Sequence, residues 1–358
     1  MSEPMVVSII TPAFNSAELL EKCIDSVLNQ TYPHVEHIIH DGGSTDETLE
    51  ILKKYGDRIQ WVSEPDRGQS DGLDKALARC TGDIIGVLNA DDEYTLEACE
   101  WAVRQFEEHP EMGAIYGDQH DVDLNSDIIQ TTIGPDYSFV DILTCDKVIP
   151  AQAAFIHRKA YEKVGFYADV TRKTCPDYEY WVRLGLEFPM LHVPGIVALY
   201  RWHPGSEGRQ GKIIHDMIES KVEVMKRIMD DPNTSEEIRA RRKEAHSGIY
   251  HWGAWSFRSN ALLWEGVKTM FKSVLLDPAP RQFTLLTNYV YDIHEHVNPD
   301  LDEKSREKLS KRWKLFRDGV LYVVRRGKRL KLLMERAESG PLKWLHSLFT
   351  RSDKKPSS

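Results

Sequence analysis

The chain of 358 residues is 41% hydrophobic, which suffices for one large domain with an appendage or for two domains. No apolar run approaches the 18 residues that a membrane-spanning helix needs, and the N-terminus lacks the basic stretch of a signal peptide. The five cysteines are odd in number and form no CxxC pair. We therefore expect free thiols in a reducing cytoplasm and no cysteine zinc site.

The net charge of −10 is unevenly distributed along the chain. Residues 311–358 hold 14 Lys and Arg against 4 Asp and Glu, a net charge of +10, whereas the 310 residues before them carry −20. This basic tail also contains apolar residues such as Trp313, Phe316 and Trp344. Two interpretations stay open. The tail could bind peripherally to the anionic inner face of a membrane, or it could form a helical hairpin that packs on the acidic residues 1–310. Nucleic acid is not expected, because no known binding motif accompanies the charge.

Short apolar strands and amphipathic helices alternate over the first 120 residues. Strands are predicted at Val6–Ile10, Val35–His40, Ile59–Val62 and Ile84–Leu88. Helices are predicted near residues 15–30, 47–55 and 71–80, the first with Asn15 or Ser16 as its N-cap. Alternation with short connections predicts an α/β fold with a parallel sheet covered by helices.

Polar and glycine-rich segments follow each predicted strand, at Thr11–Asn15, Asp41–Ser44, Glu64–Gly68 and Asn89–Asp92. The ends of parallel strands share one edge of a sheet, where ligands bind, so we expect all four segments there. Asp91 and Asp92 allow two interpretations: Mg²⁺ or Mn²⁺ bridging to phosphates, or caps of the next helix. Neither a GxxxxGK[ST] loop nor GxGxxG follows the first strand, which disfavours a P-loop enzyme and a dinucleotide dehydrogenase.

Three segments together resemble family 2 glycosyltransferases of the GT-A fold. They begin VSIITPAFN, SEPDRGQSDG and PDYEYWVRL, and the second ends in NADDEY. The similarity covers roughly residues 6–205. It implies a GT-A catalytic domain over residues 1–210, with a nucleotide-sugar half to about 118 and an acceptor half over about 119–210. A helical C-terminal region, residues 211–358, would follow, with the basic tail from about 311.

The resemblance also implies roles for residues on the donor side. Nucleotide-sugar contacts are implied for Thr11, Pro12 and Asn15 in the loop after the first strand, Asp41 at the base, Asp66 and Arg67 over the nucleotide, and Asn89, Ala90 and Asp91 at the D-x-D position. Asn89 replaces the first acid of that motif, so Asp91 becomes the metal ligand and Asp92 a second contact. From the local pattern alone, Asp41, Thr11 and Asn15 fit turns or caps equally well, and Arg67 fits a solvated surface residue.

On the acceptor side, Ile149–Ile156 resembles the family strand that lines the acceptor cleft. Asp177 matches the general base, with Pro176 in place of the preceding Glu, and an N-cap role is the alternative. Glu179 is the second candidate base. Residues 201–211, rich in Gly and charge, predict either a mobile loop or a linker. In a loop, Arg201, His203 and Arg209 could reach the diphosphate of the donor.

The function that follows from the resemblance is inverting transfer of a hexosyl or N-acetylhexosaminyl group, as in polysaccharide biosynthesis. The donor would be a nucleotide diphosphate sugar, with UDP expected, and the acceptor a glycan or lipid-linked hydroxyl. Mg²⁺ or Mn²⁺ would assist the transfer as a cofactor. A nucleotidyltransferase is an alternative, but it would want a Gly-rich basic loop where this chain has TPAFNSAELL. A non-catalytic protein that binds nucleotide sugars is the other alternative.

Overall fold

The computed structural model describes residues 3–165, 175–203, 213–260 and 262–277. The chain divides into two compact units, Met1–Ile142 with Lys147–Pro204, and Leu143–Asp146 with Gly205–Ser358. Among the described residues, no helix has the length and apolar character that crossing a membrane requires. The basic tail that the sequence predicts from about residue 311 lies outside the described residues, so its membrane and hairpin interpretations stay predictions.

The first unit is built on one mixed sheet, in which the described residues form nine strands. The strands are β1 Val7–Ala13, β2 Val35–Asp41, β3 Gln60–Ser63, β4 Ile84–Val87, β5 Glu93–Tyr94, β6 Ala114–Val122, β7 Ile128–Thr132, β8 Ala154–His157 and β9 Met190–Arg201. Their order is β3-β2-β1-β4-β8-β6-β9-β5, and β7 pairs with β6. Strands β1 to β4 are parallel as predicted, whereas β8 runs antiparallel to both β4 and β6.

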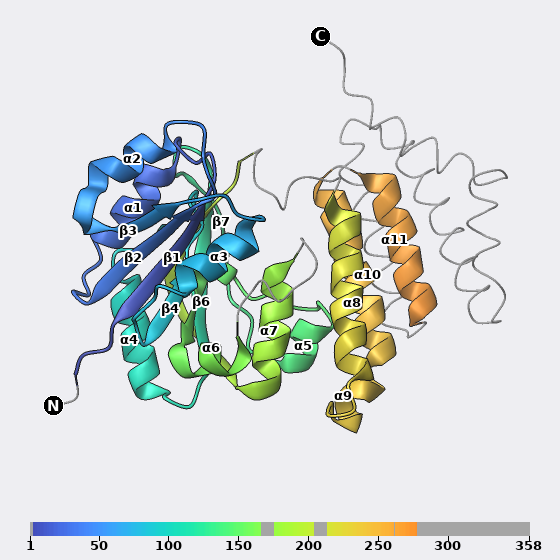
Figure 1. The fold of residues 1–358 in the computed structure, drawn as a ribbon. Helices are drawn as coiled ribbons and strands as arrows, with labels where there is room; N and C mark the ends of the chain where they lie inside the picture. Colours follow the sequence, from blue (N-terminus) through green and yellow to red (C-terminus); the bar gives the residue numbers. More distant parts are fainter. Residues whose placement is uncertain (1–2, 166–174, 204–212, 261, 278–358) are drawn as a thin grey trace, which may run out of the picture. The chain divides into compact units, whose positions relative to one another are not determined.

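Helices cover both faces of this sheet (Figure 1). They are α1 Leu20–Leu28, α2 Thr48–Tyr55, α3 Gln69–Leu77, α4 Ala98–Glu108, α5 Phe139–Leu143, α6 Arg158–Val164 and α7 Pro176–Glu187. One core cluster joins α3, α6 and α7 to sheet residues such as Ile10 and Tyr116. A second cluster joins α1 and α4 to the opposite face, through residues such as Ile9 and Phe155. The first unit is therefore a three-layer α/β/α structure.

The strand register confirms that the ends of β1 to β4 share one edge. Ala13 pairs with Asp41, Asp41 pairs with Ser63, and Ile10 pairs with Val87. One expectation is wrong here: Thr11 and Pro12 belong to β1 itself and not to the loop after it, because the ladder with β2 continues as far as Ala13.

The predicted N-cap of the first helix is also wrong. Helix α1 begins at Leu20 with Leu19 at its N-cap position, and no side chain caps it. The segment before the helix, including Asn15 and Ser16, instead pairs with the turn that precedes α2. Asn15 Oδ1 accepts from Thr45 N at 2.9 Å, and Ser16 N donates to Thr48 Oγ1 at 2.9 Å.

The second unit is helical in its described part, as the sequence predicts. Its helices are α8 Ile214–Asp230, α9 Glu236–Ala240, α10 Arg242–Ser259 and α11 Leu263–Leu276. Helix α10 packs against both α8 and α11, and Met225, Phe257 and Met270 are buried in this bundle. A Cβ at Gly253 would lie 2.3 Å from Ile218 Cδ1, so a glycine at this position permits the close approach of α10 and α8.

A buried polar pair lies at the centre of the first unit. Thr11 Oγ1 and His37 Nε2, on adjacent strands, are 2.9 Å apart. His37 is buried and its Nδ1 has no partner among the described residues. Burial lowers the pKa of the His37 imidazole to about 3 from the usual value near 6.5. Because the unfolded chain binds a proton at His37 well before the folded chain does, acid weakens the fold.

We therefore predict that His37→Gln, which can still hydrogen-bond Thr11 but does not titrate, reduces the loss of stability in acid. In the native chain His37 should lower the free energy of unfolding by up to about 1.4 kcal/mol per pH unit as the pH falls from about 6.5 toward 3. Chemical denaturation at several pH values measures this slope. His34→Gln, at an exposed histidine, is the control. Equal slopes for His37→Gln and the native chain would contradict the assignment.

Candidate functional site

Asp91 and Asp92 follow β4 directly and lie in opposite environments. The Asp91 side chain is 31% exposed, whereas Asp92 is fully buried. Asp92 accepts from Arg201 N at 2.8 Å and from Asn89 Nδ2 at 3.3 Å. Burial, followed by the charge of Asp91, raises the Asp92 pKa well above its usual value. Neither acid caps the next helix, because α4 begins at Ala98 with Glu97 at its N-cap position.

His203 meets the exposed acid of this pair. Its Nε2 lies 2.7 Å from Asp91 Oδ2, and its side chain is partly exposed. An oxygen and a nitrogen donor that face each other within reach of solvent fit Mg²⁺ or, better, Mn²⁺. No group of three or more His, Cys, Asp or Glu side chains that could hold a metal occurs in the described part of the chain. A cation bound here would therefore need further oxygen ligands, such as water or phosphate.

The structure contradicts the prediction that Arg201 belongs to a mobile loop and reaches the diphosphate. Arg201 is the last residue of β9 and its side chain is completely buried. The guanidinium donates to the carbonyls of Asp91 and Asp123, to the Glu93 carboxylate and to Ser126 Oγ. Its hydrogen bonds thus point into the protein. The third residue predicted for this loop, Arg209, lies outside the described residues.

Asp41, at the end of β2, is buried and accepts four hydrogen bonds. Oδ2 accepts from Gly43 N, Ser44 N and Ser63 Oγ, and Oδ1 accepts from Ser44 Oγ. Gly43 has φ +88°, a conformation that favours glycine. In this arrangement the Asp41 carboxylate shapes the turn before α2. The predicted contact between Asp41 and the nucleotide base stays a prediction.

Asp66 packs against two glycines near the same edge. Its Oδ2 lies 3.5 Å from Nε2 of the buried His40. A Cβ would be 2.6 Å from this Oδ2 at Gly42 and 3.0 Å at Gly72. Glycine at position 42 thus leaves room for the Asp66 carboxylate, which a larger residue there would displace.

The remaining donor-side residues are held by neighbours. Arg67 is 81% exposed, and its Nη2 pairs with Asp71 Oδ1 at 2.6 Å. Asn89 Oδ1 accepts from Gln69 Nε2 at 2.9 Å, Ala90 is buried, and Pro12 lies beside Gly72 of α3. Asp71 occupies Nε and Nη2 of Arg67, so a phosphate contact that keeps this pair would use Nη1.

Phe14 is a candidate that the sequence reasoning did not select. It follows β1 at the edge where the four segments meet, and it is 63% exposed. An exposed aromatic ring at a strand end can stack on a planar ligand. The sequence signal was an aromatic residue directly after a run of buried strand residues.

On the acceptor side, Asp177 is the second residue of α7, after Pro176. The N-cap position belongs to Cys175, so the N-cap interpretation of Asp177 is wrong. Asp177 is half-buried and forms no hydrogen bond or ion pair with any residue that the structure describes. Glu179, by contrast, is buried and accepts from Arg183 Nε with both oxygens, at 2.8 and 2.9 Å. Of the two candidate bases, Asp177 is thus the one whose carboxylate is not held by a described neighbour.

We predict that Arg201→Lys lowers the free energy of unfolding by about 1–3 kcal/mol. The ammonium keeps the charge but cannot reach the partners of the planar guanidinium, which leaves buried acceptors unpaired. Denaturant titration measures the loss. Arg79→Lys, at an exposed arginine, should change stability by less than about 0.5 kcal/mol. Equal stability of Arg201→Lys and the native chain would contradict this role.

Comparisons with known proteins show what this chain is similar to. The sequence profile described as Glycosyl transferase family 2 matches residues 8–165. Chondroitin synthase of Escherichia coli is 28% identical over 192 residues, which cover 52% of this chain and 28% of that protein. Hyaluronan synthase of Pasteurella multocida is 34% identical over 127 residues, 35% of this chain and 13% of that protein. The match thus spans less than a third of either relative.

Two solved structures share the fold. TarS residues 1–349 of S. aureus, in complex with UDP-GlcNAc, gives a TM-score of 0.58 at 15% identity and covers 91% of this chain and 93% of that one. Mannosyltransferase PcManGT from Pyrobaculum calidifontis, in complex with GDP-Man and Mn²⁺, gives a TM-score of 0.54 at 17% identity. The match covers 89% of this chain and 87% of that one. Both confirm the expected GT-A type sheet with C-terminal helices. By these comparisons, residues 8–165 are similar to glycosyl transferase family 2, and the described structure has the fold of solved glycosyltransferases.

Proposed function

We propose that this protein transfers a glycosyl group, with inversion, from a nucleotide diphosphate sugar to a hydroxyl of a glycan or lipid-linked acceptor. The observation that carries the proposal is the exposed Asp91 carboxylate, 2.7 Å from His203 Nε2 at the edge where the parallel strands end. UDP is the expected nucleotide, and a hexosyl or N-acetylhexosaminyl group is the group that we expect to be transferred. The chondroitin and hyaluronan synthases among the relatives, and the UDP-GlcNAc bound by TarS, support this choice.

Asp91 and His203 would hold Mg²⁺ or Mn²⁺, and the PcManGT complex with Mn²⁺ supports the use of a metal. When bound, the cation supplies positive charge to the departing diphosphate. Asp92 is buried and bonded to Arg201 N, so we assign it to holding Asp91 in place rather than to direct contact with the cation.

Asp177 would act as the general base. An acceptor hydroxyl is a weak nucleophile, and a carboxylate within hydrogen-bond reach removes its proton as the new glycosidic bond forms. Asp177 suits this task because no described residue occupies its oxygens. Attack by the hydroxyl opposite the leaving diphosphate inverts the anomeric centre in a single displacement. No covalent intermediate is needed, so the reaction requires one carboxylate base and no protein nucleophile.

The first test of this proposal is that Asp91→Asn lowers the Mn²⁺-dependent affinity for UDP by about tenfold or more, since one metal ligand loses its charge. His203→Gln should also lower the Mn²⁺-dependent affinity for UDP. Calorimetric titration of UDP with Mn²⁺ and with EDTA measures both. Asp57→Asn, at an exposed aspartate, is the matched control. The metal assignment fails if the native chain binds UDP equally well with Mn²⁺ and with EDTA.

The second test is that Asp177→Asn keeps the affinity for UDP but reduces turnover by about 10²–10⁴-fold. Release of UDP from UDP-sugars, measured with a panel of glycan acceptors, reports turnover. Glu179→Gln should mainly reduce stability, because Arg183 would lose its buried partner. Near-native turnover of Asp177→Asn would rule out this residue as the base.

A further inference from the structure

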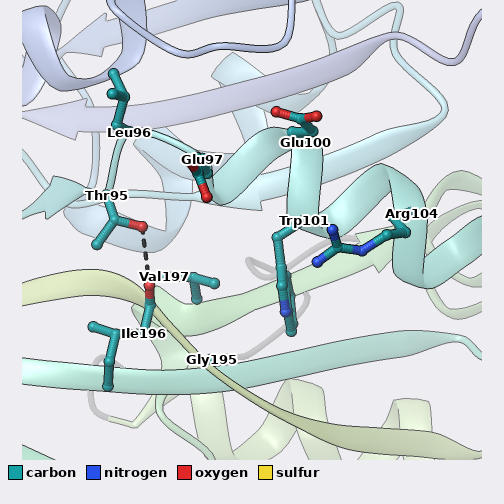
Figure 2. A pocket seen from close by; sticks show the side chains of 9 residues that line it. All are labelled: Thr95, Leu96, Glu97, Glu100, Trp101, Arg104, Gly195, Ile196 and Val197. Atoms are coloured by element: carbon teal, nitrogen blue, oxygen red, sulfur yellow. Dashed lines mark hydrogen bonds between the residues drawn. The ribbon is translucent and has the colours of Figure 1, made fainter.

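A pocket of about 490 Å³ lies between the first turns of α4 and the β9 strand, beside the segment that follows β5 (Figure 2). The predicted contacts to the sugar donor lie at the edge where the parallel strands end, which we call the donor edge. None of the residues predicted to make these contacts lines the pocket. We propose that this pocket binds a neutral sugar unit of an oligosaccharide, at a site separate from the donor edge. The choice of ligand rests on the proposed function, which supplies a glycan acceptor.

The first support is the indole of Trp101, which is only 8% exposed. Its ring packs near Phe155, with centroids 6.2 Å apart, so its orientation is fixed. Trp101 Nε1 forms no hydrogen bond with any residue that the structure describes. At Gly195, with φ +156°, a Cβ would lie 3.0 Å from this nitrogen. The glycine leaves space beside the N–H, so a ligand in the pocket can accept a hydrogen bond from this indole.

The second support is the mixed chemistry of the rim. Glu97 and Arg104 project from α4 and the residue before it (Figure 2). Both side chains are exposed, and neither side chain forms a hydrogen bond or ion pair within the described part of the chain. Leu96 and Ile196 also line the pocket and add apolar surface to it. The pocket thus offers an unpaired donor and an unpaired acceptor next to apolar surface.

A sugar ring matches this combination. Its hydroxyls both donate and accept hydrogen bonds, so one ring can serve a carboxylate, a guanidinium and an indole N–H, while its C–H groups contact the apolar surface. A second carboxylate, Glu100, also lines the pocket and accepts from Thr31 Oγ1 at 2.8 Å. Two carboxylates against one guanidinium disfavour acidic sugars and phosphates.

The pocket is also close along the chain to the proposed metal site. Thr95, on its wall, follows the proposed metal ligand Asp91 by four residues, which span at most roughly 14 Å. A short oligosaccharide covers such a distance. The pocket therefore suits a remote unit of the acceptor glycan.

Saturation-transfer NMR with chitotetraose and cellotetraose tests the proposal on the full chain, with UDP and Mn²⁺ present at saturation. At least one of these neutral probes should bind, and UDP should not displace it. Trp101→Phe, which removes the indole N–H together with part of the ring surface, and Arg104→Gln should each weaken binding about fivefold to tenfold. Arg79→Gln is the matched control and should leave the affinity unchanged.

Displacement of both probes by UDP, absence of binding at millimolar concentration, or native affinity in Arg104→Gln would overturn the proposal. Arg104 is exposed, so its variant decides the matter if Trp101→Phe loses stability. Tighter binding of a hyaluronan tetrasaccharide would overturn the preference for neutral sugars. UDP affinity, measured on the same samples, should be native in these variants. If the native chain fails to bind UDP but the probe results hold, the pocket stands and the proposed function fails.

Discussion

The buried guanidinium of Arg201 joins the end of β9 to two parts of the first unit that are far from it in sequence, one around residues 91–93 and one around residues 123–126. Removing a guanidinium from water costs several kcal/mol unless its donors are satisfied. Here the acceptors come from the segment after β4, from β5 and from the turn between β6 and β7. Because Arg201 is the last residue of β9, the same bonds position His203, two residues later. The Asp91–His203 pair thus depends on a strand whose final residue lies 110 positions beyond Asp91.

This arrangement also explains two adjacent acids at the end of a buried strand. Two like charges side by side would repel, but the pair divides into an exposed and a buried member. Burial raises the pKa of Asp92, and the backbone N–H of Arg201 holds its carboxylate. Asp91 points toward His203 and solvent. The negative charge is therefore concentrated on the residue that a cation can reach.

The sequence predicted the parts of the fold that depend on local pattern. Strands β1 to β4 and the shared edge followed from apolar runs and from the polar segments after them. Asp177 lies in the first turn of α7 behind the N-cap residue Cys175, so its N-cap alternative is wrong and its role as general base stays a prediction. The sheet becomes antiparallel at β8, which a rule based on alternating elements does not capture.

The errors concern long-range contacts. Arg201 was assigned to a loop because glycines and charges follow it, and nothing nearby in sequence shows that its partners lie near residues 91, 93, 123 and 126. Asp41 accepts four hydrogen bonds from its own turn and from β3, contacts that the local pattern does not show, and its predicted contact with the nucleotide base stays a prediction. The Trp101 pocket combines α4 with β9, so the sequence of either element alone gives no signal for it.

The central claim is that Asp91 and His203 form one cation site at the donor edge. Electron spin-echo modulation of Mn²⁺ bound together with UDP tests it most directly, because a coordinated imidazole nitrogen gives a distinct coupling. We predict that the native chain shows this nitrogen coupling and that His203→Gln loses it while UDP still binds. A native complex of UDP and Mn²⁺ without nitrogen coupling, or a coupling that persists in His203→Gln, would contradict the claim.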